Sequence, residues 1–357
     1  MKNLNIIIVC GALKSGGAER VISILSTPFA DAYKKVSLIT WRDEPQFYKI
    51  DDRIDSVSLP KLANSNNSIK KILAFRKYIA KINPNLVLSF LTIFNLLTLI
   101  SLIGIKIPVI VAERNDPRFV KGGTFVKTLR NILYQKACGI LCQTESIKRY
   151  FKGNLSRKTK IIYNPITLSR ESIGKALRTN KKKRIVSVGR LHPQKNQKLL
   201  IDSFLIFHKS HHEYTLTIYG TGNLKEELQN YIDSLGLSGI VVLAGEQKTI
   251  NELILDAEAF VLTSNYEGMP NALIEAMCLG LPCISTKVSG AVDLIEHKKN
   301  GVLVDRLPSD ISNAMELITD NYETAKEIGS QACKVYDKLK TENISKIWID
   351  YINTQLS

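Results

Sequence analysis

Two glutamates in the second half of the chain, close to the predicted start of a helix, could bind hydroxyl groups. Glu267 and Glu275 are separated by seven residues in the segment EGMPNALIE, in which Gly268 and Pro270 favour a loop and a helix begins near Asn271. Carboxylates accept hydrogen bonds from hydroxyls, so Glu275 could bind a ribose and Glu267 a further sugar. A helix-capping acid beside an exposed glutamate would give the same local pattern.

The N-terminus of this helix could also bind an anion. The first turn of a helix has N–H groups without intrahelical partners and carries a partial positive charge. The backbone N–H groups of Asn271, Ala272 and Leu273 would therefore face an anion bound beside the preceding strand.

Two cations follow an earlier strand and could hold phosphate. Val188 ends an apolar run that continues as GRLHPQKN, with Arg190 directly after Gly189 and Lys195 five residues further on. Arginine binds phosphate oxygens with a planar fork, and lysine adds a compact charge. Together the two side chains would neutralise a diphosphate, although a loop with two solvated cations is the alternative where nothing else supports binding.

A glycine-containing turn follows the first strand of the chain. Gly16 and Gly17 precede Ala18 and Glu19, where a helix starts. Glycines allow a ligand to approach the backbone closely. The spacing matches neither the dinucleotide fingerprint nor a Walker A loop, so a tight turn without a ligand explains it equally well.

Short apolar runs alternate with segments of helical period along the whole chain, which predicts two doubly wound parallel sheets in an α/β protein. A polar, basic stretch between residues 163 and 183 interrupts the alternation and predicts the linker. Ligands bind beyond the carboxyl ends of strands in such sheets, so we expect the chemistry in a cleft between the two domains. Strands are expected over residues 4–10, 36–40, 86–90, 108–113, 139–142, 184–188, 215–220, 240–243, 259–262 and 282–285, and helices over 18–30, 69–82, 93–103, 125–134, 224–234 and 272–278.

The most apolar segment, residues 86–105, is long enough to be considered as a membrane-spanning helix. Polar residues recur within it at three-residue intervals, and Gly104 interrupts it shortly before Pro108. A buried strand, a buried helix and another strand explain these features better.

Charge is distributed unevenly along the chain. Residues 1–170 contain 28 basic and 10 acidic side chains, whereas residues 171–357 contain 21 basic and 23 acidic ones. A strongly basic half indicates a polyanionic partner, either nucleic acid or an anionic membrane surface. The basic residues lack the interleaved aromatics of a platform for nucleic-acid bases. We therefore expect an anionic membrane surface and no nucleic acid.

The six cysteines include no Cys-x-x-Cys pair, and most lie in apolar runs, which is typical of a reducing compartment. The N-terminal apolar run is too short for a signal peptide. Together with the basic half, these features predict a cytoplasmic protein bound peripherally to the inner face of the membrane.

With these motifs in place, the chain resembles the family-four retaining glycosyltransferases of the GT-B fold, over nearly its whole length. The most specific part of the resemblance is the pair Glu267 and Glu275 in its EGMPNALIE setting, supported by the segment from Gly189 to Asn196 and by Gly16 and Gly17. It implies two facing Rossmann-like domains, an acceptor- and membrane-facing domain over 1–165 and a nucleotide-sugar-binding domain over 166–340. A final helix over 341–357 would pack back on the first domain.

The resemblance also implies a role for each motif residue. Arg190, Lys195 and Glu267 would be the catalytic residues, the two cations as a diphosphate clamp and Glu267 as the contact to the donor sugar. The donor would also be bound by Gly16, Gly17, Gly189, Met269, Asn271, Ala272, Leu273 and Glu275.

The sequence departs from many relatives after the strand expected over 108–113. Those relatives carry a histidine there that meets the donor sugar, whereas this chain has Arg114 and Asn115. Both are candidate contacts to sugar or acceptor. Arg114 stays charged at physiological pH and is a poor candidate for a base. Glu19 and Glu113 are candidate nucleophiles by position only, and we favour neither.

The implied reaction is retaining transfer of a hexose or N-acetylhexosamine from a UDP-sugar to a lipid-linked saccharide in bacterial polysaccharide or O-antigen biosynthesis. No Asp-x-Asp pair occurs in the chain, so we expect no metal and no cofactor. Two alternatives stay open: an enzyme similar to hydrolysing UDP-N-acetylglucosamine epimerases, and a non-catalytic protein that binds polyanions or membranes. A nicotinamide oxidoreductase is disfavoured because its fingerprint is absent.

Overall fold

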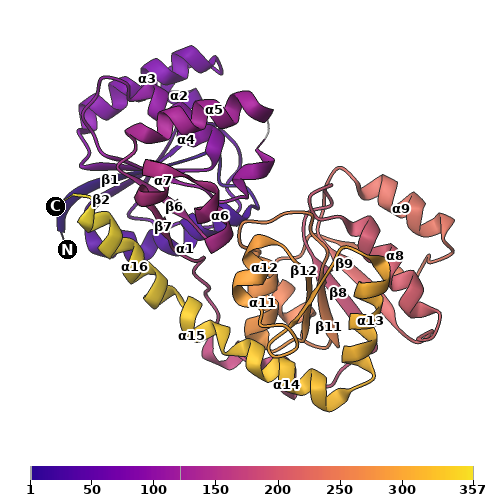
Figure 1. Ribbon diagram of the computed structural model, residues 1–357. Helices are drawn as coiled ribbons and strands as arrows, with labels where there is room; N and C mark the ends of the chain where they lie inside the picture. Colours follow the sequence, from indigo (N-terminus) through magenta and orange to yellow (C-terminus); the bar gives the residue numbers. More distant parts are fainter. Residues whose placement is uncertain (1, 121, 357) are drawn as a thin grey trace. The chain divides into compact units, whose positions relative to one another are not determined.

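The computed structural model describes residues 2–120 and 122–356, and the chain forms two compact units. The N-terminal unit comprises Met1–Thr167 with Leu339–Ser357, and the C-terminal unit comprises Leu168–Lys338. Each unit contains one parallel β-sheet flanked by helices (Figure 1). The expectation of two doubly wound α/β domains is confirmed.

The sheet of the N-terminal unit has the strand order β3-β2-β1-β4-β5-β6-β7. Its central strands are buried on both faces, as a parallel sheet between helix layers requires. The strands are β1 (Lys2–Cys10), β2 (Tyr33–Thr40), β3 (Asp55–Ser58), β4 (Leu86–Phe90), β5 (Val109–Ala112), β6 (Gly139–Cys142) and β7 (Thr159–Ile161). The α-helices are α1 (Gly17–Ala32), α2 (Leu59–Ala63), α3 (Ser68–Ile82), α4 (Thr92–Ser101), α5 (Gly123–Leu133), α6 (Glu145–Tyr150), α7 (Gly153–Lys158) and, from the C-terminus, α16 (Thr341–Thr354).

The sheet of the C-terminal unit has the strand order β10-β9-β8-β11-β12-β13. Its first strand, β8, lies between β9 and β11, so the chain order reverses there, and ligands of doubly wound sheets bind at such a point. The strands are β8 (Arg184–Val188), β9 (Thr215–Tyr219), β10 (Val241–Gly245), β11 (Ala259–Leu262), β12 (Cys283–Thr286) and β13 (Val302–Val304). The α-helices are α8 (Gln197–His208), α9 (Lys225–Ser234), α10 (Ile250–Leu253), α11 (Asn271–Leu279), α12 (Ser289–Leu294), α13 (Pro308–Thr319), α14 (Tyr322–Cys333) and α15 (Val335–Leu339).

The long apolar segment folds as the sequence predicts, into β4, α4 and β5. Asn95, Thr98 and Ser101 are buried on α4. The hydroxyl of Thr98 lies 3.2 Å from that of Ser89 on β4, and the Ser101 hydroxyl donates to the Leu97 carbonyl at 2.7 Å, so these hydroxyls are satisfied inside the unit. None of the helices within residues 2–120 and 122–356 combines the length and apolar character needed to span a bilayer.

The C-terminal helix α16 belongs to the N-terminal unit. Trp348 of α16 is fully buried, with its ring 5.8 Å from that of Phe90 at the end of β4 and 6.3 Å from that of Phe29 on α1. The hydroxyl of Tyr351 occupies the space that a side chain at position 139 would need, so Gly139 permits this close packing. The helix is held by aromatic contacts as well as by burial.

Three features differ from the sequence-based expectation. The helices α2, α6, α7, α8, α10, α12, α13, α14 and α15 were not among the elements expected. The short strands β3, β7 and β13 were not expected; each is an edge strand of three or four residues, too short to give a periodic pattern. Much of the expected linker is packed against the C-terminal unit, because Gly174 N–H donates to the carbonyl of Cys278 and Ala176 is fully buried.

Candidate active site

Two loops at the carboxyl edge of the C-terminal sheet lie side by side. The first follows β8 and leads to α8, and the second follows β11 and leads to α11. They are adjacent because β8 and β11 pair directly, with Val186 opposite Phe260. Residues about 70 positions apart in the sequence are thereby brought together.

Backbone and side-chain hydrogen bonds join the two loops. Asn265 N–H donates to the carbonyl of Gln194 at 2.8 Å, and its side chain donates to that of Pro193 at 2.9 Å. The Thr263 hydroxyl lies 3.1 Å from the carbonyls of both Lys195 and Asn196. The loops therefore form one hydrogen-bonded platform.

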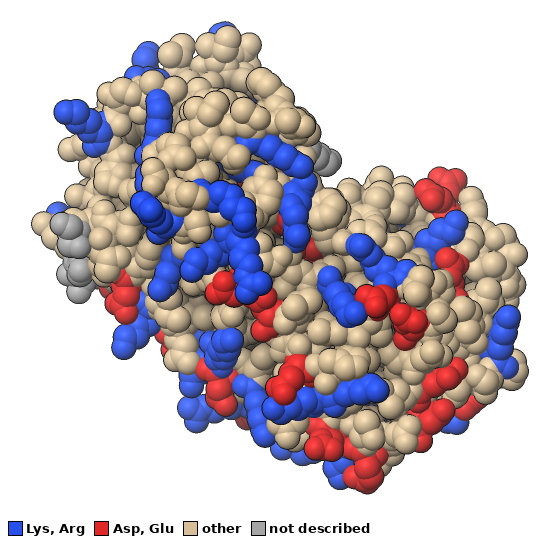
Figure 2. All heavy atoms as spheres, viewed as in Figure 1, with Lys and Arg blue, Asp and Glu red and all other residues tan. Residues whose placement is uncertain are grey.

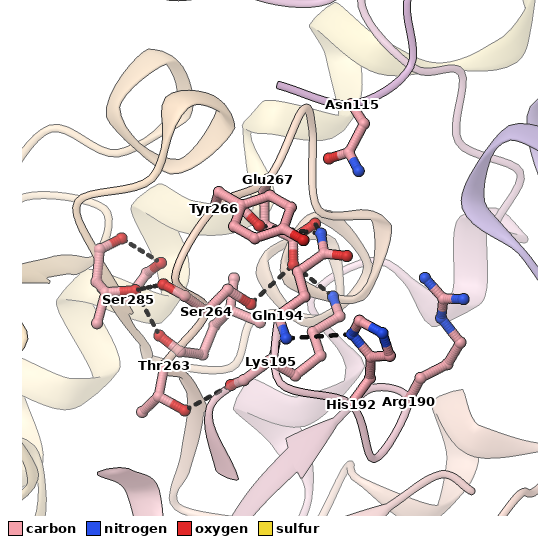
Figure 3. A network of polar contacts seen from close by, with 12 residues as sticks. Asn115, Arg190, His192, Gln194, Lys195, Thr263, Ser264, Tyr266, Glu267 and Ser285 are labelled. Carbon is pink, nitrogen blue, oxygen red and sulfur yellow. Dashed lines mark hydrogen bonds and ion pairs between the residues drawn. The ribbon is translucent and has the colours of Figure 1, made fainter. Parts of the chain in front are cut away.

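An ion pair lies at the centre of this platform (Figure 3). Lys195 Nζ is 2.6 Å from Glu267 Oε1, and the two side chains are 17% and 9% exposed. Ser264 Oγ donates to the same carboxylate oxygen at 2.7 Å, and Gln194 Nε2 lies 3.4 Å from the other. Shielded ion pairs persist when further hydrogen bonds satisfy their atoms, as here. The ammonium has two further N–H donors with which it can bind a ligand.

Arg190 stands beside this pair but is not part of it. Its side chain is exposed, and its carbonyl accepts a hydrogen bond from Gln197 Nε2 at 2.7 Å, which fixes its backbone. Within the described part of the chain, its guanidinium forms no ion pair, and Figure 3 shows it outside the Lys195 and Glu267 cluster. Burial and the Glu267 charge raise the pKa of Tyr266, whereas Arg190 lowers it, so Arg190 acts electrostatically on the second loop.

The helix start predicted at Asn271 is confirmed. α11 begins there, and the preceding Pro270 provides no side-chain cap for its first N–H groups. Glu275 lies one turn inside the helix and is 4% exposed. Burial and, to a smaller extent, the charge of Glu275 raise the pKa of the Cys278 thiol. Met269 and Leu273 are buried.

Glycines that the sequence analysis did not single out shape both loops. An added Cβ at Gly220 would lie 2.1 Å from the carbonyl oxygen of Gly189, and one at Gly222 would lie 2.1 Å from that of Leu191. At Gly290, on α12, it would lie 2.6 Å from the carbonyl oxygen of Gly268. The segment YGTGN after β9 was the available signal for the first two.

A second polar cluster lies at the carboxyl edge of the N-terminal sheet. Arg114, after β5, is 7% exposed and donates through Nη2 to Asn164 Oδ1, which also accepts from Gln143 Nε2 at 3.1 Å. Burial lowers the pKa of Arg114 to about 9, while Cys142 and Glu19 oppose this decrease. In residues 2–120 and 122–356, Arg114 Nε and Nη1 have no hydrogen-bond partner.

The other candidates of the N-terminal unit have structural contacts. Gly16 is the extended N-cap of α1, and the Glu19 side chain folds over it, so that a Cβ at Gly16 would collide with the carboxylate; Gly17 is the first residue of α1. Asn115 accepts a hydrogen bond from Asp116 N–H at 3.0 Å.

Glu113 is enclosed and is not placed to act as a nucleophile. It is 1% exposed, Thr92 Oγ1 donates to one carboxylate oxygen at 2.7 Å, and the Tyr134 hydroxyl donates to the other. Burial raises its pKa, and the buried Arg130 opposes this increase. These contacts hold β5 against α4 and the end of α5.

Comparison with known proteins places these features in a family. Residues 15–170 match the model of Glycosyltransferase Family 4, and residues 169–335 match that of Glycosyl transferases group 1. The chain is 30% identical, over 95% of its length and 97% of the relative's, to the N-acetylgalactosamine-N,N'-diacetylbacillosaminyl-diphospho-undecaprenol 4-alpha-N-acetylgalactosaminyltransferase of Campylobacter jejuni. The chain belongs to the family-four glycosyltransferases. This glycosyltransferase also shares 27% identity with the amylovoran biosynthesis glycosyltransferase AmsD of Erwinia amylovora, over 98% of this chain and 99% of that one.

Solved structures confirm the GT-B fold of the glycosyltransferase. Anabaena HepE in complex with UDP-glucose superposes with a TM-score of 0.82, at 18% identity, over 99% of this chain and 100% of that chain. In the described residues of the family-four enzyme, no group of three or more His, Cys, Asp or Glu is placed to hold a metal ion.

We predict that Gly222→Ala destabilises this glycosyltransferase by about 1–3 kcal/mol, the usual cost of overpacking. The added methyl would collide with the Leu191 backbone, which cannot move aside like a flexible side chain. The free energy of unfolding of the variant should be measured in denaturant. Gly236→Ala is the control, since nothing lies within 4 Å of the added carbon and only its positive φ is penalised. Equal stability of Gly222→Ala and the native enzyme would contradict the close approach.

Proposed function

We propose that this glycosyltransferase moves a hexose or N-acetylhexosamine from a UDP-sugar to a lipid-linked saccharide, with retention of anomeric configuration. The observation that carries the proposal is the platform on which Lys195 and Glu267 are paired beside Arg190 at the start of α11. Cations and helix N–H groups around one point suit a diphosphate, and two carboxylates suit sugar hydroxyls.

The identity of the donor and acceptor is supported by relatives of known activity. Two similar proteins of Campylobacter jejuni are named as N-acetylgalactosaminyltransferases acting on undecaprenol-diphosphate glycans, and HepE was crystallised with UDP-glucose. A relative from Escherichia coli is named as a UDP-galactose-dependent galactosyltransferase with a diphosphoundecaprenol acceptor. We therefore assign a UDP-sugar as donor and a lipid diphosphate glycan of a bacterial polysaccharide or O-antigen pathway as acceptor.

In the proposed mechanism, the positive groups stabilise the leaving diphosphate. Negative charge develops on the phosphate oxygen as the glycosidic bond breaks, and preorganised donors aimed at that charge lower the barrier. Arg190, Lys195 and the first N–H groups of α11 provide these donors. Glu275 binds the ribose hydroxyls. Glu267 has a double role, since it orients the Lys195 ammonium and accepts hydroxyls of the donor sugar.

Retention is assigned to attack on the face from which the diphosphate leaves. The acceptor hydroxyl loses its proton to the departing phosphate oxygen, so no protein carboxylate has to form a bond to the sugar. The enclosure of Glu113 by Thr92 and Tyr134 supports this assignment. The charge carried by Arg190 and Lys195 makes a divalent metal unnecessary for the leaving group.

We place the enzyme at the cytoplasmic face of the membrane, where a lipid-linked acceptor lies. The excess of basic residues in the N-terminal half fits an anionic lipid surface. Figure 2 shows Lys and Arg side chains on the N-terminal unit, with no Asp or Glu over the part where Figure 1 places α2 and α3.

The test is a transfer assay with a panel of radiolabelled UDP-sugars and an undecaprenyl-diphosphate saccharide. We expect one donor to label the lipid fraction, with the anomeric configuration of the donor kept in the product by NMR. The same assay without acceptor should release little UDP. Stoichiometric release of UDP with an epimerised free sugar, or an inverted product, would overturn the proposal.

A further inference from the structure

A pocket of about 270 Å³ lies in the C-terminal unit, away from the candidate active site. Lys181, Glu258 and Pro282 line it just before β8, β11 and β12 begin. It therefore lies at the amino edge of the sheet, whereas the loops of the candidate active site follow the carboxyl ends of β8 and β11. The rest of its wall is the junction of α13 and α14, at the lower end of this unit in Figure 1.

Helix α11 runs between the two places, and its end forms a fixed wall of the pocket. The C-cap of α11, Gly280, lines the pocket and has the positive φ of 85° that favours glycine. An added Cβ at Gly329 of α14 would lie 2.4 Å from the Gly280 carbonyl oxygen, and one at Gly280 would lie 2.9 Å from Leu177 Cγ. Because these segments are in close contact, the wall is already formed in the unliganded enzyme.

Two lysines of the pocket have no anionic partner. In the described residues, Lys181 and Lys326 form no ion pair, whereas the adjacent Lys182 pairs with Asp256 at 2.9 Å. Lys181 Nζ donates to the Leu255 carbonyl at 3.0 Å and keeps two further N–H donors. Burial lowers the pKa of Lys181 to about 8, although nearby carboxylates oppose this decrease. An anion in the pocket would stabilise the charged form of this ammonium.

One carboxylate also lines the pocket but leaves it net positive. Glu258 accepts a hydrogen bond from the Tyr214 hydroxyl at 2.5 Å and, within the described residues, pairs with no cation. The lining thus contains two cations and one carboxylate. This balance favours an anionic ligand over a cationic one.

The remaining lining is apolar and includes an exposed aromatic ring. Tyr322, the first residue of α14, is 66% exposed, and Lys326 Nζ lies 5.8 Å from the centre of its ring. The exposed face of such a ring can stack on a flat ligand. Aliphatic surface is provided by Leu177, Pro282, Ile318 and Ala325.

We infer that this pocket binds a small anion that carries one flat aromatic ring, either an aromatic carboxylate or an aromatic phosphate monoester. Lys181 and Lys326 contact the anionic group, and the ring lies between Tyr322 and the aliphatic wall. The volume of about 270 Å³ is below the roughly 300–1,000 Å³ of sites for drug-sized ligands, so the pocket excludes a whole UDP-sugar. The inference is independent of the proposed function, because the pocket shares no residue with the candidate active site.

The test is titration of the full-length enzyme with phenyl phosphate and with benzoate, followed by NMR of the ligand. At least one of the two should bind with a Kd of about 1 mM or lower. Inorganic phosphate, which has no ring, and benzyl alcohol, which has no charge, should each bind roughly tenfold more weakly. Lys181→Gln/Lys326→Gln should weaken binding of the aromatic anion by roughly 10²-fold, and Tyr322→Ala by about fivefold.

Matched controls lie elsewhere on the same unit. Lys209→Gln/Lys225→Gln removes two exposed lysines and Leu307→Ala an exposed apolar side chain, and both variants should bind as the native enzyme does. Ala325→Leu fills the pocket without changing its charge and should weaken binding by roughly tenfold. A melting curve of each variant checks that it is folded. Equal loss in the controls, native binding by Ala325→Leu, or no binding of either aromatic anion would overturn the inference.

The candidate active site is the other place where an anion could bind. Arg190→Ala should bind the aromatic anion with the affinity of the native enzyme, because Arg190 follows the opposite end of β8. Loss of binding in Arg190→Ala with native binding by Lys181→Gln/Lys326→Gln would overturn the inference alone. Predicted binding in the pocket by an enzyme that transfers no sugar would overturn the proposed function alone.

Discussion

Arg190→Ala should lower turnover with saturating donor by roughly 10²- to 10³-fold, the usual loss when one preorganised donor to a developing oxyanion is removed. Arg190 is exposed and forms no ion pair within the described residues, so its guanidinium contributes little to the fold. The melting temperature should therefore stay within about 1 °C of the native value. Transfer of radiolabelled sugar under single-turnover conditions measures the effect on chemistry apart from product release.

Two further variants separate charge from geometry. Arg190→Lys keeps a positive charge but loses the planar fork, and we expect a turnover between those of the alanine variant and the native enzyme. Arg178→Ala removes another exposed arginine of the same unit, from a segment that packs near Gly280 at the far end of α11. It should leave turnover unchanged. Native activity in Arg190→Ala would remove this residue from the proposed diphosphate site.

Lys195→Ala should impair both activity and stability, for different reasons. Turnover should fall roughly 10²- to 10³-fold because the second cation at the diphosphate is lost. Stability should fall by about 3 kcal/mol, since a shielded carboxylate, Glu267, then has no cationic partner. The hydrogen bond from Ser264 at 2.7 Å keeps the loss near the lower end of the range for broken buried pairs.

The double variant Lys195→Ala/Glu267→Gln distinguishes the two effects. The neutral amide no longer needs a cation, so most of the lost free energy of unfolding should return. Turnover should be no higher than in Lys195→Ala, because the substitution also alters the Glu267 contact to the donor sugar. Urea unfolding and the transfer assay measure the two quantities on the same preparations. Recovery of activity together with stability would show that Lys195 acts only through the fold, contrary to the proposed mechanism.

The architecture could be predicted because the buried strands of a parallel sheet have a distinctive apolar sequence. Strands such as β4 and β11 are buried along their whole length and appear as uninterrupted apolar runs. The edge strands β3 and β7 are half-exposed and short, so their residues carry no such signal. The segment before β8 appeared to be a linker because Ala176 and its neighbours are surrounded by polar residues in the sequence.

The sequence selected the residues of the candidate site but not the contacts between them. Arg190 and Lys195 were assigned to a diphosphate and Glu267 to the donor sugar, with no contact expected between Lys195 and Glu267. The direct pairing of β8 with β11 brings Lys195 and Glu267 to 2.6 Å, and strand order is not a local property of sequence. The same reason applies to Gly222, whose necessity depends on the backbone of Leu191 more than 30 positions away.

The environment of Arg114 likewise depends on the order of strands in the sheet. The sequence identified Arg114 as a cation where many relatives carry a histidine, and as a candidate contact to sugar or acceptor. The fold buries it against Asn164, which follows β7 two strands away in the sheet. Its burial, the lowered pKa and the two N–H donors without partners depend on that sheet order.

The most direct test of the central claim is a crystal structure of the enzyme with UDP bound. The account predicts the pyrophosphate within hydrogen-bond distance of the Arg190 guanidinium, Lys195 Nζ and the first turn of α11, with the ribose hydroxyls on Glu275. UDP bound at any site that leaves Arg190 and Lys195 without contact to the pyrophosphate would contradict it.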